Sequence, residues 1–331
     1  MSEREVNRWT RIISEDKPEE KKPKPELILS DGKFEPYWVE ALSDDDYHDD
    51  KTFVSSSNLK KVLLSKRTFY NDFFLAKKKD EKEKECFRLG KMFHMAILEG
   101  DKFKENFVLM PEFEALNGKG ELTKNKNCKA VKEKYAAFRA SLPSSAVICS
   151  ESEREQIIGS VYSLLEHPQA AQIMKDSLTE VSGFFVDEES GLRCKIRPDI
   201  LSKNCVILGD LKTTRMVDSM RFQNSVFDLG YYISMYMYTQ GIKAISGVEP
   251  KIIPIIAMEN TMPFECSIHY FKMENLRDYA SREYRKALTD IRQAVDSGDW
   301  HQKQKHWEEI QPPAWWIYRQ MKLEEKENNQ P

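Results

Sequence analysis

The sequence predicts a mixed α/β fold in which helices flank both faces of a central sheet. Three strand-like apolar runs occur between residues 179 and 214, and two more cover 251–259 and 264–272. A long amphipathic pattern then spans 273–298, as expected of a helix lying over a sheet. With 331 residues, 40% hydrophobic and 32% charged, the chain is long enough to bury one sizeable core.

The N-terminal residues differ in composition from the rest. Around residues 16–26 the chain reads DKPEEKKPKPE, which is rich in Lys, Glu and Pro. Such a segment cannot bury enough apolar surface to fold alone. We therefore expect a flexible charged tail over residues 1–45 and a folded domain over residues 46–325.

Helical patterns dominate the first half of that domain. Ser55–Ser57 offer an N-cap for a helix that continues to about residue 74. A lysine-rich stretch at 77–84 reads as a solvated connector, and a second helix is expected at about 84–99. Residues 124–176 predict two or three amphipathic helices, and residues 218–245 predict one helix crowded with tyrosines.

The central strands are expected at 179–187, 192–198 and 204–214, with a turn at 188–191 between the first two. Side chains alternate between the two faces of a strand. Asp210 and Lys212 therefore point the same way, on the face that also carries Val206 and Leu208.

Charged groups at the end of such an apolar strand need a partner or a metal ion. The carboxylates of Glu180, Asp199 and Asp210 match the few oxygen ligands that Mg²⁺ takes from a protein. A bound metal can hold a scissile phosphate and lower the pKa of a water, while Lys212 neutralises growing charge or positions the water. The alternative is an Asp210–Lys212 ion pair on an exposed edge, with Arg-Pro-Asp as a plain turn.

The overall charge of −3 argues against a broadly basic DNA-binding surface. A local basic stretch surrounds the acids, however, and Arg193, Lys195, Arg197 and Arg215 are its candidates for phosphate contacts. Tyr231 is a candidate for stacking on a base. The alternative is that these cations are solvated and that the tyrosines belong to the core.

Taken together, these motifs resemble a known family. Glu180, Arg197-Pro198-Asp199 and Asp210-Leu211-Lys212-Thr213-Thr214, preceded by the G-x-x-x-H-x-x-x-L-E pattern of Gly90–Glu99, are similar to the exonuclease VIII (RecE-type) nuclease domain. That domain belongs to the PD-(D/E)XK superfamily, which also contains phage lambda exonuclease. The resemblance covers roughly residues 45–320 and implies the PD-(D/E)XK nuclease fold, a central mixed sheet flanked by helices.

The resemblance also changes the interpretation of His94. A lone histidine on a helix face is more often part of a core than a metal ligand, but the family's histidine at this position lies at the metal site. It therefore implies a metal role for His94 beside Glu180, Asp199 and Asp210, with Mg²⁺ as the cofactor and Mn²⁺ as the alternative. One position departs from the family, because Ser234 stands where a glutamine is usual.

The family likeness implies a magnesium-dependent exonuclease that digests double-stranded DNA ends from 5′ to 3′ in phage-type homologous recombination. It also implies a homo-oligomeric ring and a single-strand annealing protein as partner. Two alternatives stay open. One is an endonuclease of the same fold. The other is a catalytically weak relative that binds DNA ends or a partner, which Ser234 and the acidic overall charge favour.

The remaining sequence features concern location. No run of 18 apolar residues occurs, and the N-terminus lacks the apolar segment of a signal peptide, so we expect a cytoplasmic protein without membrane contact. The six cysteines are widely spaced and include no C-x-x-C, which argues against a zinc ribbon or a disulfide framework.

Overall fold

The structure is a computed structural model that describes residues 24–75, 85–143, 145–301 and 309–328. It divides into two compact units, Met1–Trp300 and His301–Pro331, which are described separately. The second contains helix α13 (Ala314–Asn328), on which Trp316, Ile317 and Tyr318 are exposed. The boundary between the units thus falls after Trp300, whereas the sequence predicted a single domain up to residue 325.

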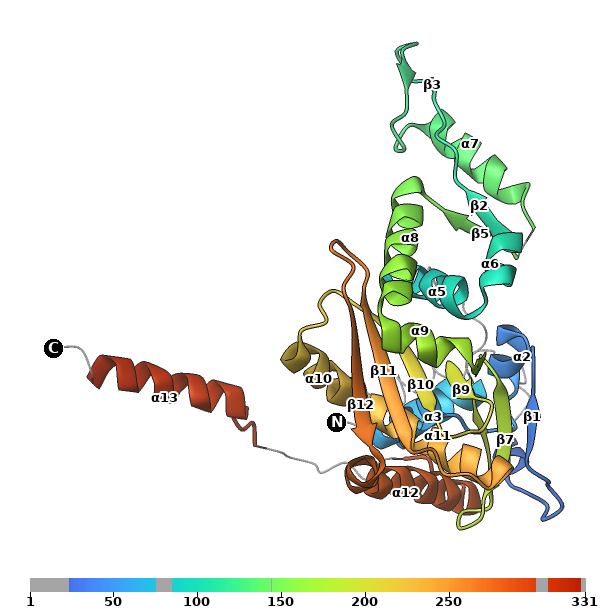
Figure 1. Cartoon of the computed structure of the whole chain (residues 1–331), viewed down its shortest axis with the longest axis vertical. Helices are drawn as coiled ribbons and strands as arrows, with labels where there is room; N and C mark the ends of the chain where they lie inside the picture. Colours follow the sequence, from blue (N-terminus) through green and yellow to red (C-terminus); the bar gives the residue numbers. More distant parts are fainter. Residues whose placement is uncertain (1–23, 76–84, 144, 302–308, 329–331) are drawn as a thin grey trace, which may run out of the picture. The chain divides into compact units, whose positions relative to one another are not determined.

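The first unit is built on a five-stranded mixed sheet (Figure 1). Its strand order is β12-β11-β10-β9-β6, and only the β10–β11 pair is parallel. This mixed sheet confirms the predicted fold class. The strands are β6 (Ser177–Thr179), β9 (Ile200–Ser202), β10 (Leu208–Thr214), β11 (Ile252–Glu259) and β12 (Cys266–Lys272).

A smaller antiparallel sheet contains β1 (Tyr37–Val39), β7 (Ser182–Asp187) and β8 (Leu192–Ile196) in the order β1-β7-β8. The chain passes from β6 in the large sheet to β7 in the small one at Glu180, and it returns from β8 to β9 through Arg197–Asp199. The two crossings lie side by side, since the Glu180 N–H donates a hydrogen bond to the Asp199 carbonyl at 3.3 Å. The single strand predicted over 179–187 is therefore interrupted at Glu180.

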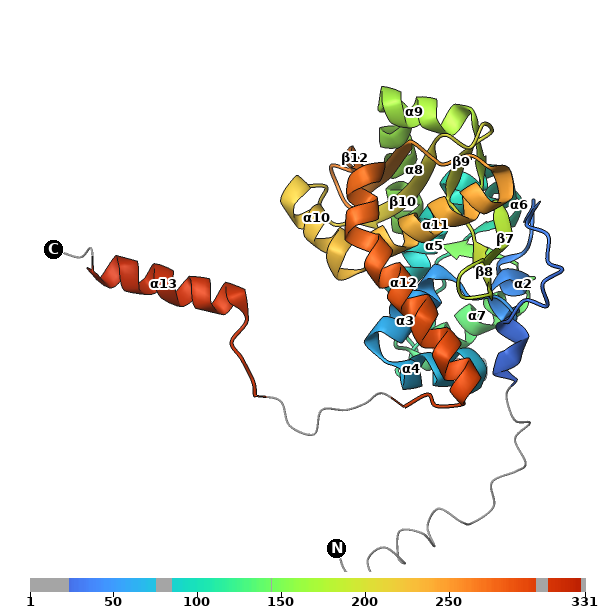
Figure 2. The same cartoon turned by 90° about the horizontal axis from the view of Figure 1, so that it is seen from below.

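Helices cover the large sheet in two layers (Figures 1 and 2). Leu208 belongs to a core with α3 (Ser56–Leu64), α11 (Tyr231–Ser246) and α12 (Met273–Ser297). Leu211, on the opposite face of β10, packs in another core with residues of the helices α5, α8 and α9. The alternation predicted for β10 is thus present. These three helices are α5 (Glu85–Leu98), α8 (Glu151–Glu166) and α9 (Pro168–Lys175).

Two predicted helices are broken in the structure. The first divides at Ser65, whose hydroxyl caps the following short helix by accepting from the Thr68 N–H at 3.2 Å. The second divides at Gly230, where φ is 64° and a Cβ would lie 2.8 Å from Lys60 Cδ. Only glycine fits this left-handed, crowded position easily. The resulting elements are α4 (Lys66–Tyr70), the π-helical turn η2 (Asn71–Leu75) and α10 (Ser219–Asp228).

Part of the segment predicted to be an N-terminal tail is folded. Residues 1–23, and also the expected lysine-rich connector at 77–84, lie outside the described residues. Residues 24–45 belong to the first unit: Ile28 in the short helix η1 (Pro25–Ile28) is fully buried, and β1 pairs with β7. The composition of this segment is dominated by charged residues, which led to the prediction of a tail. Its few apolar side chains nevertheless pack into the core.

Between α5 and α8 the chain forms a projecting arm, defined here as residues 107–149 (Figure 1). It follows α6 (Gly100–Asn106) and leads into α8, so α7, α8 and α9 confirm the helices predicted over 124–176. The arm contains β2 (Phe107–Leu109), β3 (Ala115–Leu116), β4 (Leu122–Thr123), α7 (Lys129–Ala140) and β5 (Val147–Cys149).

None of the described helices is both long and apolar enough to cross a membrane.

Candidate active site

A pocket of about 630 Å³ opens where the two chain crossings meet the end of β10. Its walls come from α5, from the start of α3, from the start of α11 and from α2 (Asp44–Asp49). Glu180 and Lys212 both line it. Segments that are far apart in the sequence thus converge here because the chain changes sheets at this point.

Three of the predicted metal ligands meet in this region. One potential ligand atom each from His94, Glu180 and Asp199 lies within 4.8 Å of the other two. His94 projects from α5, whereas Glu180 and Asp199 sit on the two crossings. Glu180 has a φ of 52°, a left-handed conformation that non-glycine residues adopt rarely and that occurs often at functional sites.

Lys212 lies between the two acids of the predicted motif. Its Nζ is 2.6 Å from Asp210 Oδ2 and 3.6 Å from Asp199 Oδ2. Asp199 Oδ2 also accepts the Leu211 N–H at 2.7 Å. Asp210 is only 4% exposed, and despite the short contact with Lys212 its Oδ2 makes no hydrogen bond of good geometry. The predicted shared face of Asp210 and Lys212 is therefore present, and the ion pair with Lys212 is the contact made by this buried carboxylate oxygen.

The crowding of acids shifts their proton affinities. Burial, with the charge of Asp199, raises the pKa of Glu180 to about 8. Burial also raises the pKa of Asp210 to about 7, even though Lys212 acts in the opposite direction. Both carboxylates therefore keep their protons to a higher pH than a free carboxyl group does.

Asp199 and His94 respond differently. Burial by itself would raise the pKa of Asp199, but Lys212, His94 and the Leu211 amide together outweigh it and lower that pKa. Burial lowers the pKa of His94 despite the nearby Asp199, whose Oδ2 is 3.8 Å from His94 Nδ1. His94 is thus held as the neutral imidazole, the form that can ligate a metal.

These features fit a divalent cation. Neutral imidazole and carboxylate oxygens are suitable ligands, and a cation would favour the ionised forms of Glu180 and Asp210 that burial disfavours. The residues that would hold it are His94, Glu180 and Asp199. Asp210, the fourth predicted ligand, is not part of this group, and its Oδ2 is paired with Lys212 instead.

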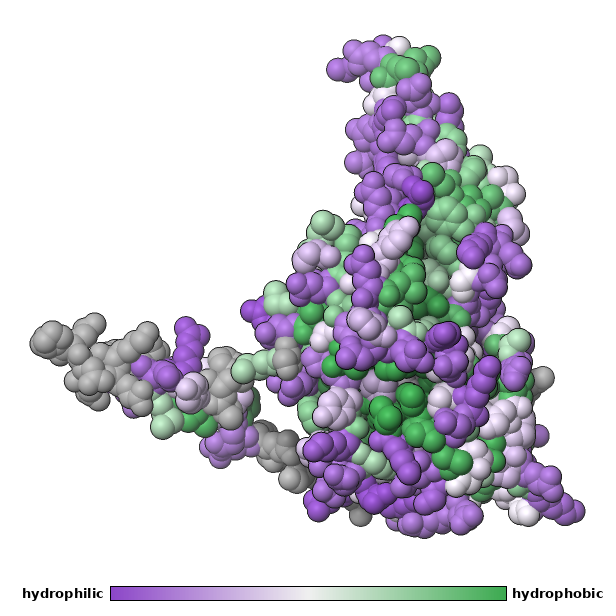
Figure 3. All heavy atoms as spheres, viewed as in Figure 1, coloured by the Kyte–Doolittle hydropathy of each residue, from purple (hydrophilic) through white to green (hydrophobic). Residues whose placement is uncertain are grey.

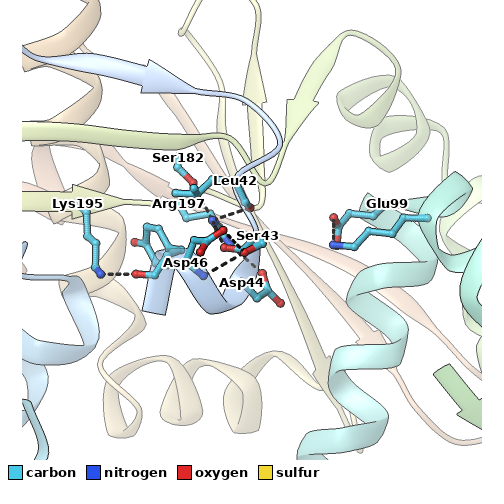
Figure 4. A network of polar contacts seen from close by, with 10 residues as sticks. Leu42, Ser43, Asp44, Asp46, Glu99, Ser182, Lys195 and Arg197 are labelled. Atoms are coloured by element: carbon cyan, nitrogen blue, oxygen red, sulfur yellow. Dashed lines mark hydrogen bonds and ion pairs between the residues drawn. The ribbon is translucent and has the colours of Figure 1, made fainter. Parts of the chain in front are cut away.

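Two residues predicted to contact DNA instead anchor α2 (Figure 4). Lys195, 3% exposed, donates to the carbonyls of Tyr47 and Asp50, the latter at 2.7 Å. Arg197 donates to Ser182 Oγ, Asp44 Oδ1 and the Leu42 carbonyl at 2.8–3.0 Å, and its guanidinium lies 4.1 Å from the Tyr47 ring centroid. We call Lys195, Arg197 and their α2 partners the α2 clamp. Their donors are used within the protein, which corrects the expectation of phosphate contacts, although Arg197 also lines the pocket.

The other predicted DNA contacts are divided. Arg193 does not line the pocket: it lies beside Phe34, at 5.9 Å from the ring centroid, and 3.9 Å from Asp31. Arg215 and Tyr231 do line the pocket. Lys212 Nζ lies 5.2 Å from the Tyr231 ring centroid, so this ring stands directly beside the predicted reactive groups.

Several pocket residues were not among the predicted site residues. Asp44 and His48 lie on α2, a helix that spans the predicted boundary between the tail and the folded domain. Tyr238 is partly buried near the acids, and desolvation raises its pKa. Glu99 closes the pocket from the end of α5, where the G-x-x-x-H-x-x-x-L-E pattern could have indicated it. Ser234 is buried on α11 and is not among the pocket-lining residues.

Comparison with known proteins agrees with this fold. Residues 55–308 match the model of a family described as a PDDEXK-like domain of unknown function. The crystal structure of a protein titled "Putative exonuclease", from Eubacterium rectale, is similar with a TM-score of 0.51 at 14% identity, covering 85% of this chain and 98% of that one. The crystal structure of SSO0001 also matches, at 10% identity over 63% of this chain and 86% of that chain, but its TM-score of 0.24 supports no argument. No curated protein matches the sequence.

Proposed function

Because this chain belongs to the family of PDDEXK-like domains, we propose that it is a metal-dependent nuclease, and specifically an exonuclease acting on the ends of double-stranded DNA. One observation carries the proposal. The potential metal ligands His94, Glu180 and Asp199 stand next to a lysine that is held 2.6 Å from a buried, under-satisfied carboxylate. Family membership alone would not require this arrangement to be intact in the present chain.

In the proposed reaction a bound Mg²⁺ supplies Lewis acidity toward the scissile phosphate and lowers the pKa of an attacking water. The carboxylates of Glu180 and Asp199 and the imidazole of His94 would hold that ion, and the motif resemblance adds Asp210. Lys212 stays protonated, since the charges of Asp210 and Asp199 outweigh the effect of burial and raise its pKa. Its ammonium group therefore stabilises negative charge on the phosphate or orients the water through a hydrogen bond.

The finer assignments rest on the motif resemblance. Digestion from 5′ to 3′, a role in phage-type recombination, a ring of several copies and a single-strand annealing partner all belong to the proposal. Arg215 and Tyr231 support a nucleic-acid substrate, because they place a cation and an aromatic ring on the wall of the same pocket.

A digestion assay tests this function. Linear duplexes labelled at the 5′ or the 3′ end, with and without a 5′ phosphate, are incubated with the full chain and Mg²⁺, Mn²⁺ or EDTA. We expect metal-dependent release of nucleotides from the 5′ end, abolished by Asp210→Asn. Release from the 3′ end contradicts the polarity, and cutting of closed circular DNA at the same rate favours an endonuclease.

The nuclease assignment itself fails if linear DNA survives in both metals. In that case calorimetric titration with Mg²⁺ and Mn²⁺ distinguishes a metal-binding enzyme with another substrate from a protein that binds DNA ends without cleaving them. Ser234 makes the second outcome worth testing, because the resemblance associates that position with glutamine.

A further inference from the structure

The arm has a charge opposite to that of the rest of the chain. Residues 107–149 contain seven Lys and Arg against four Glu, a net charge of +3, although the whole chain carries −3. Six of the seven cations are lysines, and all seven basic side chains are exposed. A net positive charge therefore lies on a projecting element of a chain that is acidic overall.

Internal packing holds the arm together and leaves its lysines on the outside. Phe113, ahead of β3, meets the rings of Tyr135 and Phe138 on α7, with centroids 4.9 and 5.7 Å apart. Val131 on α7 is fully buried. These side chains pack within the arm, whereas Lys119 and Lys132 are exposed and make no ion pair among the described residues.

The tip of the arm combines this charge with a small apolar surface. Leu116 on β3 and Leu122 on β4 are cross-strand partners, and they are 61% and 64% exposed. Figure 3 shows an apolar group of atoms at the end of the arm beside hydrophilic residues, and a further apolar area near the root of the arm. Exposed apolar side chains flanked by lysines are the combination with which proteins contact the sugars and base edges of a DNA groove while neutralising phosphates.

The root of the arm is fixed to the helix that carries His94. Arg88 Nη1 on α5 donates to the Ile148 carbonyl on β5 at 3.2 Å. Met92 and Phe93 of α5 share a core with Cys149, and Phe107 packs against it. A ligand held by the arm would therefore be held in a defined relation to α5 and to the pocket.

We propose that the arm is a binding surface for double-stranded DNA, contacting the duplex away from the end that enters the pocket. This inference rests on the proposed function for the choice of DNA. A second copy of this chain is the less suitable occupant, because lysine is depleted in the centre of protein interfaces and the two exposed leucines form only a small apolar patch. Phosphates, in contrast, require exposed cations of this kind.

The test compares two triple variants of equal charge change. Lys119→Gln/Lys129→Gln/Lys132→Gln removes three exposed cations from the arm, and Lys203→Gln/Lys243→Gln/Lys251→Gln removes three exposed cations from elsewhere in the first unit. Binding of a fluorescent blunt duplex is measured in EDTA over a series of salt concentrations, so that cleavage does not enter. We expect the arm variant to bind about 10- to 100-fold more weakly, with a salt slope smaller by about 2 to 3, and the control variant to bind as the wild type does.

A second variant tests the tip without changing charge. Leu116→Ala/Leu122→Ala alters only exposed side chains, and we expect about 3- to 10-fold weaker binding with an unchanged salt slope. Thermal melts of every variant check that the fold is intact, and analytical ultracentrifugation follows the size of the particle.

The proposal is overturned if the arm triple variant binds the duplex with the same affinity and the same salt slope as the wild type. It is also overturned if the wild-type chain does not bind duplex DNA. A change of particle size with unchanged DNA binding shows instead that the arm joins copies of the chain. The two proposals can fail separately. If the wild type binds DNA through the arm but never cleaves it, the proposed nuclease activity is refuted. If the wild type cleaves DNA and the arm variant binds DNA normally, the proposed DNA-binding role of the arm is refuted.

Discussion

The candidate active site and the α2 clamp are both clusters of buried charge, yet they differ in how fully the charges are satisfied. In the clamp, Lys195 and Arg197 direct their donors at carbonyls, a hydroxyl and one carboxylate. In the active site, two carboxylates share one lysine, and the buried Oδ2 of Asp210 has only its ion pair with Lys212, without a hydrogen bond of good geometry. Satisfied charge holds an element in place, whereas under-satisfied charge is available to a ligand.

Asp187 shows that this difference does not depend on the sign of the charge. It is 7% exposed, but its carboxylate accepts from Ser190, Tyr284 and Arg285. Burial alone would raise the pKa of Asp187, and the hydrogen bonds from Arg285 and Ser190 outweigh it and lower that pKa. We therefore interpret Asp187, which has this set of donors, as a structural residue, whereas we interpret Asp210 as part of the candidate active site.

The largest effect is expected at Lys212. Lys212→Met removes the only cation within ion-pair distance of Asp210 among the described residues, and cleavage of linear DNA should fall by about 1,000-fold or more. The measurement is the initial rate of nucleotide release with saturating Mg²⁺. An active Lys212→Met enzyme would show that the unsatisfied cluster is not the reactive centre.

The same substitution in the clamp should act on stability and not on chemistry. Lys195→Met leaves the carbonyls of Tyr47 and Asp50 without their buried donor, which should lower the free energy of unfolding by about 2–4 kcal/mol. Denaturant titration measures this loss, and Lys203→Met at an exposed turn is the control, with a change within about 0.5 kcal/mol. If Lys195→Met protein that is still folded loses cleavage by the same factor as Lys212→Met, the distinction between the two clusters is broken.

The pH dependence of the metal-free protein sharpens the comparison further. The pKa of Glu180 is raised from 4.5 to about 8 by burial and Asp199, so between these values the folded state keeps a proton that the unfolded state has lost. Stability therefore rises as pH falls through about 8 and is lost as pH rises through this window.

Differential scanning calorimetry in EDTA should show the melting temperature falling between pH 5 and 8, and Glu180→Gln should flatten this dependence by a few degrees. Mg²⁺ should restore stability at pH 8 in the wild type, because the cation favours the ionised acids. A melting temperature independent of pH in the wild type would argue that the acids of the pocket are already satisfied.

The smallest effect is expected at the pocket wall. Tyr231→Ala should weaken binding of a duplex with a frayed end by about 1–2 kcal/mol through loss of stacking, while Tyr231→Phe keeps the ring and should bind like the wild type. Fluorescence anisotropy in EDTA compares the three proteins. Equal weakening by both variants would assign the effect to the hydroxyl and not to the ring.

The fold could be predicted from the sequence wherever a single segment carries its own pattern. The apolar strands at β10, β11 and β12 and the long helix α12 were expected at nearly their observed positions, because alternation and helical spacing are local properties. The breaks at Ser65, Glu180 and Gly230 were not expected. The chain leaves the sheet at Glu180 beside Asp199, which is distant in sequence, and at Gly230 it takes a left-handed conformation next to the side chain of Lys60 from α3.

The candidate site was predicted in part for a similar reason. Asp210 and Lys212 share a face of one strand, so their proximity follows from the spacing of two residues. Lys195 and Arg197 also share a basic stretch with Lys212 in the sequence, yet Lys195 lies on the smaller sheet, Arg197 follows that strand, and both contact the α2 segment. Local composition cannot separate a cation that meets a carbonyl from one that meets solvent.

The sequence by itself determined the mixed α/β class, the alternation that brings Asp210 to Lys212, and the motif resemblance that pointed to Glu180, Asp199 and His94. Only the tertiary structure decided that the two crossings between sheets place Glu180 beside Asp199, and that α2 closes the pocket while the clamp uses the expected DNA-binding cations. The physical reason is that side-chain direction along a strand is a local geometric property. Whether a buried charge is satisfied depends on partners that only folding brings near.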